Sequence, residues 1–223
     1  MGRTHIAATA GALLIVITAW SQASKEHSET VANPGAIQLF NGQNFDGWKL
    51  FIPEDEGVDP ATVWEVRDGG ILYCTGTPAG YIRTTEEYES YRLTFEWRWP
   101  EGGGNNGLLI HIQEPDTVWP KSIEGQLQAE NAADLWVIGG AEFKEHTDPE
   151  NRRVPKMHKH NEKPLGEWNH YEAVCDSDTI RLTINGLLQN VATECTVTKG
   201  YIGLQSEGTP IEFRNIVLEP LEK

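Results

Sequence analysis

Alternation of apolar and polar positions is the strongest pattern in this chain, and it predicts β-strands. Residues 91–99 read YRLTFEWRW, so the aromatic and aliphatic side chains share one face and the polar side chains share the other. This is typical of a half-buried antiparallel strand. The runs GLLIHIQ over residues 107–113 and SIEGQLQA over residues 122–129 predict two further strands.

The last third of the chain predicts an antiparallel hairpin and two more strands. Two alternating runs meet at Asn185 and Gly186, and this dipeptide favours a hairpin because both turn residues require positive φ. Further strands are expected from Gly200 and from Pro210. Strand signals recur throughout and no long stretch has a helical period. The sequence therefore predicts an all-β fold, an antiparallel β-sandwich of the jelly-roll type.

A polar stripe on the strand over residues 122–129 is the first candidate site. Residues two apart on a strand point the same way, so Glu124, Gln126 and Gln128 share one face, and Ile123 and Leu127 share the other. The polar face is either a ligand-binding groove or an ordinary solvent-exposed face.

Glu124 is the only acid of this stripe before Glu130, which lies six residues further on, roughly 20 Å along a strand. Paired carboxyls in glycosidases lie ~5 to 9.5 Å apart. This strand therefore does not offer the usual pair. A second carboxylate could still come from another strand or loop, and the sequence leaves three residues open for this role: Asp134, Glu142 and Glu207.

His111 is the second candidate for chemistry. Alternation over residues 107–113 places it with Leu109 on the polar side, opposite Ile110 and Ile112. It is either a structural histidine or an acid/base partner or metal ligand. No cysteine or histidine spacing matches a zinc site, and a divalent metal is left as an option without a defined ligand set.

Composition limits the partners. The 223 residues carry a formal net charge of −15, which disfavours nucleic acid and anionic membrane surfaces, because binding to phosphates requires lysine and arginine. Neutral sugars remain suitable ligands. Trp136 lies near a loop, and an exposed indole can stack on a sugar ring. The three cysteines leave open either a disulfide between Cys175 and Cys195 or three buried thiols.

The chain is expected to have three parts. Residues 1–23 read as a secretory signal, with Arg3 before an apolar run and a small-x-small site at residues 21–23. The apolar run is shorter than the ~20 residues that span a bilayer, which argues against a membrane anchor. Export to the periplasm or the extracellular space is therefore expected. Residues 24–36 read as a linker and residues 37–223 as one domain.

The segment over residues 142–163 is irregular and locally basic in an acidic protein. It is either a solvated loop or a lid over a binding cleft, since long loops in compact domains are often functional. His158 and His160 lie within it, but an irregular loop gives little support for a metal site.

Several motifs, in order, resemble the 3-keto-disaccharide hydrolase domain family, a group of concanavalin A-like sandwiches. They are LFNGQNFDGW over residues 39–48, WEV followed by DG over residues 64–69, NNG over residues 105–107, EGQ over residues 124–126, and the hairpin with GYIGLQ and FRNI towards the end. The resemblance covers residues 37–220. Asn106 departs from the family, which usually has serine there.

The resemblance implies an enzyme that cleaves 3-keto-glycosides. A ketone at carbon 3 acidifies the hydrogen on carbon 2, so one base and one charge stabiliser suffice for elimination followed by hydration. We expect Glu124 to be the base, with His111 as its partner. The expected substrate contacts are Gln126, Gln128, Asn105, Trp136 and Arg214, although Arg214 fits a salt-bridged sheet residue equally well. The alternatives are a non-catalytic carbohydrate-binding module and an interaction or matrix domain.

Overall fold

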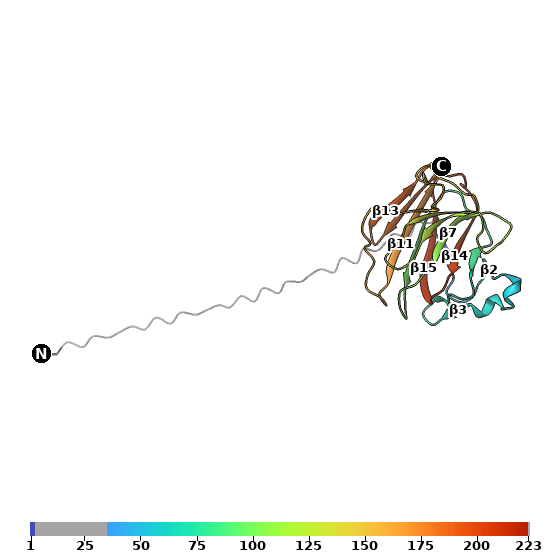
Figure 1. Cartoon of the computed structure of the whole chain (residues 1–223). Helices are drawn as coiled ribbons and strands as arrows, with labels where there is room; N and C mark the ends of the chain where they lie inside the picture. Colours follow the sequence, from blue (N-terminus) through green and yellow to red (C-terminus); the bar gives the residue numbers. More distant parts are fainter. Residues whose placement is uncertain (3–34, 223) are drawn as a thin grey trace. The chain divides into compact units, whose positions relative to one another are not determined.

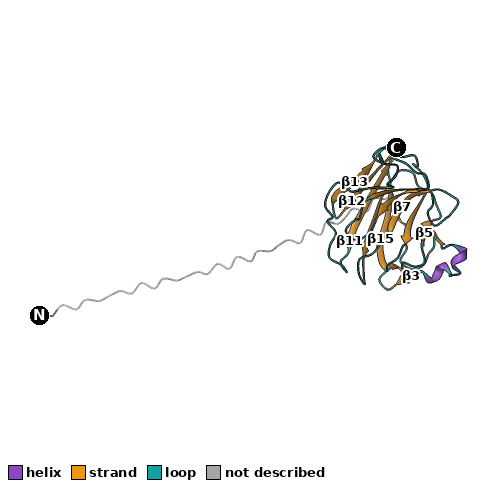
Figure 2. Cartoon of the chain, viewed as in Figure 1, coloured by secondary structure: helices purple, strands orange, loops and turns teal. Residues whose placement is uncertain are grey.

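The computed structural model describes residues 1–2 and 35–222, and residues 35–222 form two antiparallel β-sheets packed face to face (Figures 1 and 2). The first sheet has the order β13-β12-β11-β6-β15-β4-β3, with β1 paired to β15. Its strands are β1 (Ile37–Gln38), β3 (Trp64–Arg67), β4 (Ile71–Cys74), β6 (Tyr91–Arg98), β11 (Asn169–Asp176), β12 (Thr179–Ile184), β13 (Leu187–Ala192) and β15 (Ile211–Pro220).

The second sheet carries the site described below and has the order β10-β9-β8-β7-β14-β5-β2. Its strands are β2 (Trp48–Phe51), β5 (Gly80–Thr84), β7 (Gly107–Ile112), β8 (Ser122–Gln126), β9 (Leu135–Ile138), β10 (Arg153–Val154) and β14 (Tyr201–Ser206). Two short 3-10 helices, η1 (Glu54–Glu56) and η2 (Pro60–Thr62), lie between β2 and β3. The predicted all-β sandwich is therefore confirmed.

The predicted strands and hairpin are found where the alternation placed them. Residues 91–98 form β6, whose burial alternates along the strand. Asn185 and Gly186 connect β12 to β13 with φ values of 47° and 82°, as a tight hairpin requires. The strands expected from Gly200 and Pro210 are β14 and β15.

The main core lies between the two sheets. In the first sheet, Phe95 of β6 stacks on Tyr171 of β11, with ring centroids 4.9 Å apart, and Phe213 of β15 meets Phe95 edge-on. Leu108 and Ile110 of β7 enter the same cluster from the second sheet. Burial of apolar surface between the layers is the main term that stabilises such a sandwich.

A smaller apolar cluster lies on the outer face of the second sheet. Leu109 and Ile112 of β7 pack there with Tyr81 of β5 and Ile138 of β9. These side chains point away from the main core, so β7 is buried on both faces. This part of the outer face is therefore a covered floor and not a solvent-exposed surface.

The structure decides between the two alternatives that the sequence left open for the cysteines. Cys74, Cys175 and Cys195 are free and buried, which agrees with the alternative of three buried thiols. Burial raises the pKa of Cys175 and of Cys195 to about 12, so both thiols stay protonated at neutral pH and are poor nucleophiles.

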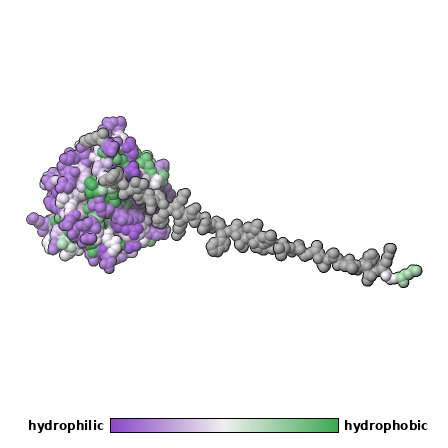
Figure 3. Space-filling model, turned by 180° about the vertical axis from the view of Figure 1, so that it is seen from behind, coloured by the Kyte–Doolittle hydropathy of each residue, from purple (hydrophilic) through white to green (hydrophobic). Residues whose placement is uncertain are grey.

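The surface reflects the acid-rich composition, and the face seen in Figure 3 is mostly hydrophilic, with hydrophobic residues in small patches. Within the described part of the chain, no helix is long and apolar enough to cross a membrane. The predicted signal segment and most of the predicted linker lie outside the described residues, so the signal, the linker and export stay predictions.

Candidate functional site

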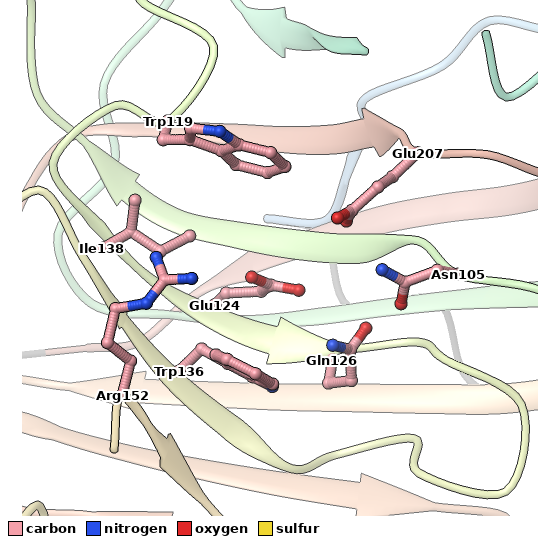
Figure 4. Close-up of a pocket in the computed structure, with 8 residues that line it drawn as sticks. All are labelled: Asn105, Trp119, Glu124, Gln126, Trp136, Ile138, Arg152 and Glu207. Carbon is pink, nitrogen blue, oxygen red and sulfur yellow. The ribbon is translucent and has the colours of Figure 1, made fainter. Parts of the chain in front are cut away.

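A small pocket of about 120 Å³ opens on the outer face of the second sheet (Figure 4). It brings together residues from β8, β9, the end of β14 and three loops. Its lining combines two carboxylates, two amides, two indoles, one guanidinium and one aliphatic side chain: Glu124, Glu207, Asn105, Gln126, Trp119, Trp136, Arg152 and Ile138.

Glu124 lies in the middle of this pocket. It belongs to β8, directly between Leu109 of β7 and Trp136 of β9, and its side chain faces outward because Ile123 and Leu127 point into the core. Only 5% of the residue is exposed. The predicted outward direction of Glu124 and Gln126 is therefore correct, and these two residues form a buried wall of the pocket.

A glycine on the neighbouring strand gives the carboxyl its space. A Cβ on Gly107 of β7 would lie 2.4 Å from Oε1 of Glu124 and 2.3 Å from Oε1 of Gln205 on β14. Both distances are far below an ordinary contact, so the two side chains occupy the volume that any larger residue would need. Gly107 thus makes the approach of Glu124 to Gln205 sterically allowed.

Burial determines the ionisation of Glu124. The pKa of Glu124 is raised to about 8, mainly because the carboxyl is buried away from water and also because the charge of Glu207 is near. The charge of Arg152 and a hydrogen bond with Gln205 act in the opposite direction. Its Oε1 has no hydrogen-bond partner among residues 35–222. A buried carboxyl with a pKa near neutrality and an unpaired oxygen is typical of a catalytic acid or base.

Glu207 supplies the second carboxylate that β8 lacks. It follows β14 directly and forms a β-bridge with Asn105, whose side-chain amide hydrogen-bonds the carboxylate. Burial raises the pKa of Glu207 above its ordinary value despite this bond. In Figure 4 its carboxylate points toward the centre of the pocket. Of the three acids left open by the sequence, Glu207 is the one that lines the pocket.

The other two acids have partners elsewhere. Asp134 binds Arg153 through Nε at 2.7 Å, and Glu142 binds His146 through Nδ1 at 2.6 Å. Asp134 also accepts a hydrogen bond from the backbone N–H of Lys156. These contacts make both residues structural in the folded chain.

Two tryptophans enclose the pocket. In Figure 4 the indoles of Trp119 and Trp136 lie on opposite sides of Glu124. Trp136 belongs to β9 and has the guanidinium carbon of Arg152 at 5.5 Å from its ring centroid. Trp119 lies on the β7–β8 loop and is 46% exposed. Paired aromatic faces on either side of a polar floor suit the apolar C–H faces of a sugar ring.

The loop that carries Trp119, residues 113–121, is fixed by Asp116. Its Oδ1 accepts hydrogen bonds from Arg83 Nε at 2.7 Å and from Tyr81 Oη at 2.8 Å, and its Oδ2 accepts one from Lys49 Nζ at 2.6 Å. Burial alone would raise the pKa of Asp116, but the bonds from Arg83 and Lys49 lower it to about 2. The carboxylate is therefore ionised at neutral pH and holds the Trp119 wall against the sheet.

His111 does not belong to this site, and its predicted orientation is wrong. The residue has φ of 56°, and the pairing of β7 with β14 shifts at this point. The ring therefore turns inward and packs edge-on against Tyr91, 5.6 Å between centroids, with Nδ1 3.2 Å from the carbonyl oxygen of Val197. Ile112 moves to the outer face in turn. Burial lowers the pKa of His111 to about 4.

Three of the predicted substrate contacts line the pocket, and two do not. Asn105, Gln126 and Trp136 line it with Glu124. Gln128 lies beyond the end of β8 and lines a neighbouring hollow instead. Arg214 belongs to β15 in the first sheet. Its Nε lies 2.8 Å from Oε2 of Glu96, so it matches the salt-bridged alternative that the sequence left open.

The basic segment over residues 142–163 forms neither a free loop nor a complete lid. Arg153 and Val154 form β10, an edge strand paired to β9, and Arg152 next to it is the residue of the segment that lines the pocket. Sequence reasoning did not single out Arg152, because a basic residue on an irregular segment carries no signal of its final neighbours. Among the described residues, no group of three or more His, Cys, Asp or Glu side chains is arranged to hold a metal ion.

The fold and the pocket define a concanavalin A-like sandwich with a carboxyl-bearing pocket on the outer face of one sheet. The solved structure of a β-glucanase from Bacillus licheniformis has this fold, with a TM-score of 0.55 and 12% identity over 85% of this chain and 99% of the glucanase. The chain belongs to the family of the 3-keto-alpha-glucoside-1,2-lyase-like domain, which matches residues 35–219.

Two relatives agree with this assignment. A 3-keto-disaccharide hydrolase from Bacteroides thetaiotaomicron is 23% identical, over 84% of this chain and 79% of that protein. A crystal structure of a protein from Parabacteroides distasonis has a TM-score of 0.63 and 23% identity, over 84% of this chain and 94% of that one. Membership of the family indicates a function like that of glycosyl hydrolases, whereas the structural similarity at this identity concerns the fold alone.

Proposed function

We propose that this protein is an exported enzyme that cleaves 3-keto-glycosides, with Glu124 as the general base. The observation that carries the proposal is the position of Glu124, buried between two tryptophans with one oxygen free of hydrogen bonds within the described domain. Family membership supports the substrate class. The predicted signal over residues 1–23 supports export.

The chemistry needs a base that removes a proton next to a ketone. The Glu124 carboxylate takes the hydrogen from carbon 2, and the electron pair of that C–H bond forms an enolate with the ketone at carbon 3. The enolate then reforms the ketone while a double bond forms between carbons 1 and 2 and the bond from carbon 1 to the leaving oxygen breaks. Water adds across the double bond and completes a net hydrolysis.

A carboxyl with a pKa of about 8 suits this step. Its carboxylate is a stronger base than that of an ordinary glutamate, and general bases are most efficient when their pKa lies near the working pH. The activity should therefore rise as the pH rises through about 8, because only the ionised form can accept the proton.

Glu207 and the amides take the complementary roles. Burial raises the pKa of both Glu124 and Glu207, and the charge of Glu207 raises that of Glu124 further, so one protonated and one ionised carboxyl are favoured over two carboxylates. Glu207, held by Asn105, is the donor that protonates the leaving oxygen. Gln126 and Gln205 lie beside Glu124 and are suited to bind sugar hydroxyls or the developing oxyanion.

The test is release of 3-keto-glucose from a 3-keto-glucoside by the purified protein and by its Glu124→Gln variant. We expect a loss of at least 100-fold in kcat for the variant, the usual contribution of a positioned base. Glu96→Gln, on the first sheet, is the matched control. Undiminished turnover by Glu124→Gln removes the proposed base, and sugar binding without turnover by the unmodified protein identifies a carbohydrate-binding module instead.

A further inference from the structure

The pocket contains one positive charge that the proposed mechanism does not use. Of the 8 residues that line the pocket, Arg152 alone is cationic. Its guanidinium lies over the ring of Trp136. Among residues 35–222 it has no salt-bridge partner, whereas Arg153 beside it is bound to Asp134. The N–H groups of Arg152 are therefore available to a ligand in the pocket.

The backbone around Arg152 is held on both sides. The carbonyl oxygen of Arg152 accepts a hydrogen bond from the N–H of Val137 on β9 at 3.0 Å. Before it, the carbonyl oxygen of Asn151 lies 3.1 Å from Nε2 of His146. After it, Arg153 pairs with β9 as the first residue of β10. The side chain of Arg152 therefore extends from a fixed point at the edge of the pocket.

The charge of Arg152 acts on both carboxyls of the pocket. Burial raises the pKa of Glu124 and that of Glu207, and the positive charge of Arg152 acts against this rise at each of them. Interactions between charges weaken with distance and with intervening water, so the guanidinium lies close enough to influence both. A negative charge that forms within the pocket is attracted to Arg152 in the same way.

The order of these groups across the pocket matches the order of three carbons in a sugar ring. In Figure 4, Glu124 lies in the middle, with Glu207 on one side of it and Arg152 on the opposite side. In a pyranose, carbon 2 lies between carbon 1 and carbon 3. If carbon 2 faces Glu124 and the leaving oxygen on carbon 1 faces Glu207, the oxygen on carbon 3 points towards Arg152.

The amides of the pocket lining lie on the other side. In Figure 4, Asn105 and Gln126 lie on the Glu207 side of Glu124, and the side chain next to Arg152 is the apolar Ile138. The amides are therefore placed to bind hydroxyls or the leaving oxygen. Arg152 is the charged group on the side where the oxygen on carbon 3 comes to lie.

We propose that Arg152 is a catalytic residue that binds the oxygen on carbon 3 and stabilises the enolate formed when Glu124 takes the proton from carbon 2. This inference rests on the proposed function. In that step the negative charge moves from the Glu124 carboxylate to the oxygen on carbon 3, to which the guanidinium donates hydrogen bonds. Arg152 is exposed in the free protein. A bound ring covers it, and the exclusion of water strengthens its attraction to the new charge.

The test compares Arg152→Gln and Arg152→Lys with the unmodified protein on a 3-keto-glucoside, across the pH range around the pKa of Glu124. At the high-pH plateau, kcat of Arg152→Gln should fall at least 100-fold, the usual loss for one donor to an oxyanion. Arg152→Lys keeps the charge and should recover part of this loss. The rising limb of the pH profile should move to higher pH in Arg152→Gln, because Arg152 lowers the pKa of Glu124. A purely structural role would not move the limb.

Arg181→Gln is the matched control, since it removes an exposed arginine of β12 in the first sheet. It should change neither kcat nor the position of the limb. A plateau kcat of Arg152→Gln within a few-fold of the original value, or equal losses for Arg152→Gln and Arg181→Gln, would overturn the role of Arg152. Cleavage by the unmodified protein would leave the proposed function standing in both cases.

A second measurement separates enolate formation from cleavage. Exchange of the hydrogen on carbon 2 for deuterium in heavy water, followed by NMR of the recovered substrate, reports the enolate directly. Exchange without cleavage, slowed by Arg152→Gln but not by Arg181→Gln, would overturn the proposed cleavage and support the role of Arg152. If the unmodified protein catalyses neither cleavage nor exchange, both proposals are overturned.

Discussion

Replacement of Glu124 by glutamine should change how the stability of the protein depends on pH. The pKa of this carboxyl is about 8 in the folded protein, whereas an unfolded glutamate titrates near ~4.3. Because the folded pKa lies above the unfolded one, the stability that goes with protonated Glu124 is complete below the unfolded pKa. It is lost as the pH rises through the window that ends near 8.

The size of the effect follows from that difference in pKa. One unit corresponds to about 1.4 kcal/mol, so the rise from 4.5 to about 8 corresponds to a few kcal/mol. This is a large fraction of the ~5–15 kcal/mol by which a typical domain is stable. The unfolding free energy of Glu124→Gln, which keeps the shape but cannot ionise, should rise relative to that of the unmodified protein by a few kcal/mol between pH 5 and pH 9.

Urea unfolding followed by tryptophan fluorescence between pH 5 and pH 9 measures this difference. Glu145→Gln is the control of opposite sign. Glu145 accepts hydrogen bonds from the backbone N–H and the hydroxyl of Thr193, and these bonds lower its pKa although burial acts against them. That variant should lose stability above pH 5. Unfolding free energies of Glu124→Gln and the unmodified protein that run parallel from pH 5 to pH 9 would refute the reasoning.

Two further changes test the geometry around the pocket. Gly107→Ala places a methyl group 2.4 Å from Glu124 Oε1, where ordinary contacts begin at 3.4 Å, so the carboxyl has to move by about 1 Å and kcat/KM should fall about 100-fold. Gly203→Ala on the adjacent strand is the control and should leave kcat/KM within a few-fold of the original value; equal losses for the two variants would contradict the steric argument. Asp116→Asn removes the charge that holds the Trp119 loop, so the melting temperature should fall by about 5 °C. In activity assays KM should rise more than kcat falls, and an unchanged KM would show that the loop does not need the Asp116 charge.

Alternation along the sequence was sufficient to orient β8. It placed Glu124 and Gln126 on one face and Ile123 on the other, and the structure confirms this. The same rule failed at His111, because a residue with positive φ shifts the register against β14. Such a bulge depends on how two strands pair, and a pattern within one strand contains no information about its partner.

The sequence limited the second carboxylate of the pocket to three candidates but could not identify which of them lies near Glu124. Glu207 follows the alternation of Gly203 and Gln205 on β14, which suggests an outward direction. Its approach to Glu124 depends on the order β8-β7-β14, which brings together residues far apart in sequence. Arg214 was misplaced for the same reason. Alternation along β15 shows which face of the strand Arg214 lies on, but it does not show that β15 belongs to the first sheet, away from the pocket.

The two acidic groups of the pocket and the residues that shape its walls come from different kinds of backbone. Glu124 lies within a hydrogen-bonded strand and Glu207 directly at the end of another, whereas three of the wall residues, Asn105, Trp119 and Arg152, lie on connecting segments. Loops tolerate insertion and exchange far better than central strands do. A chain with this scaffold can therefore change which ligands fit the pocket by remodelling loops alone, while the two carboxyls keep their places on the sheet.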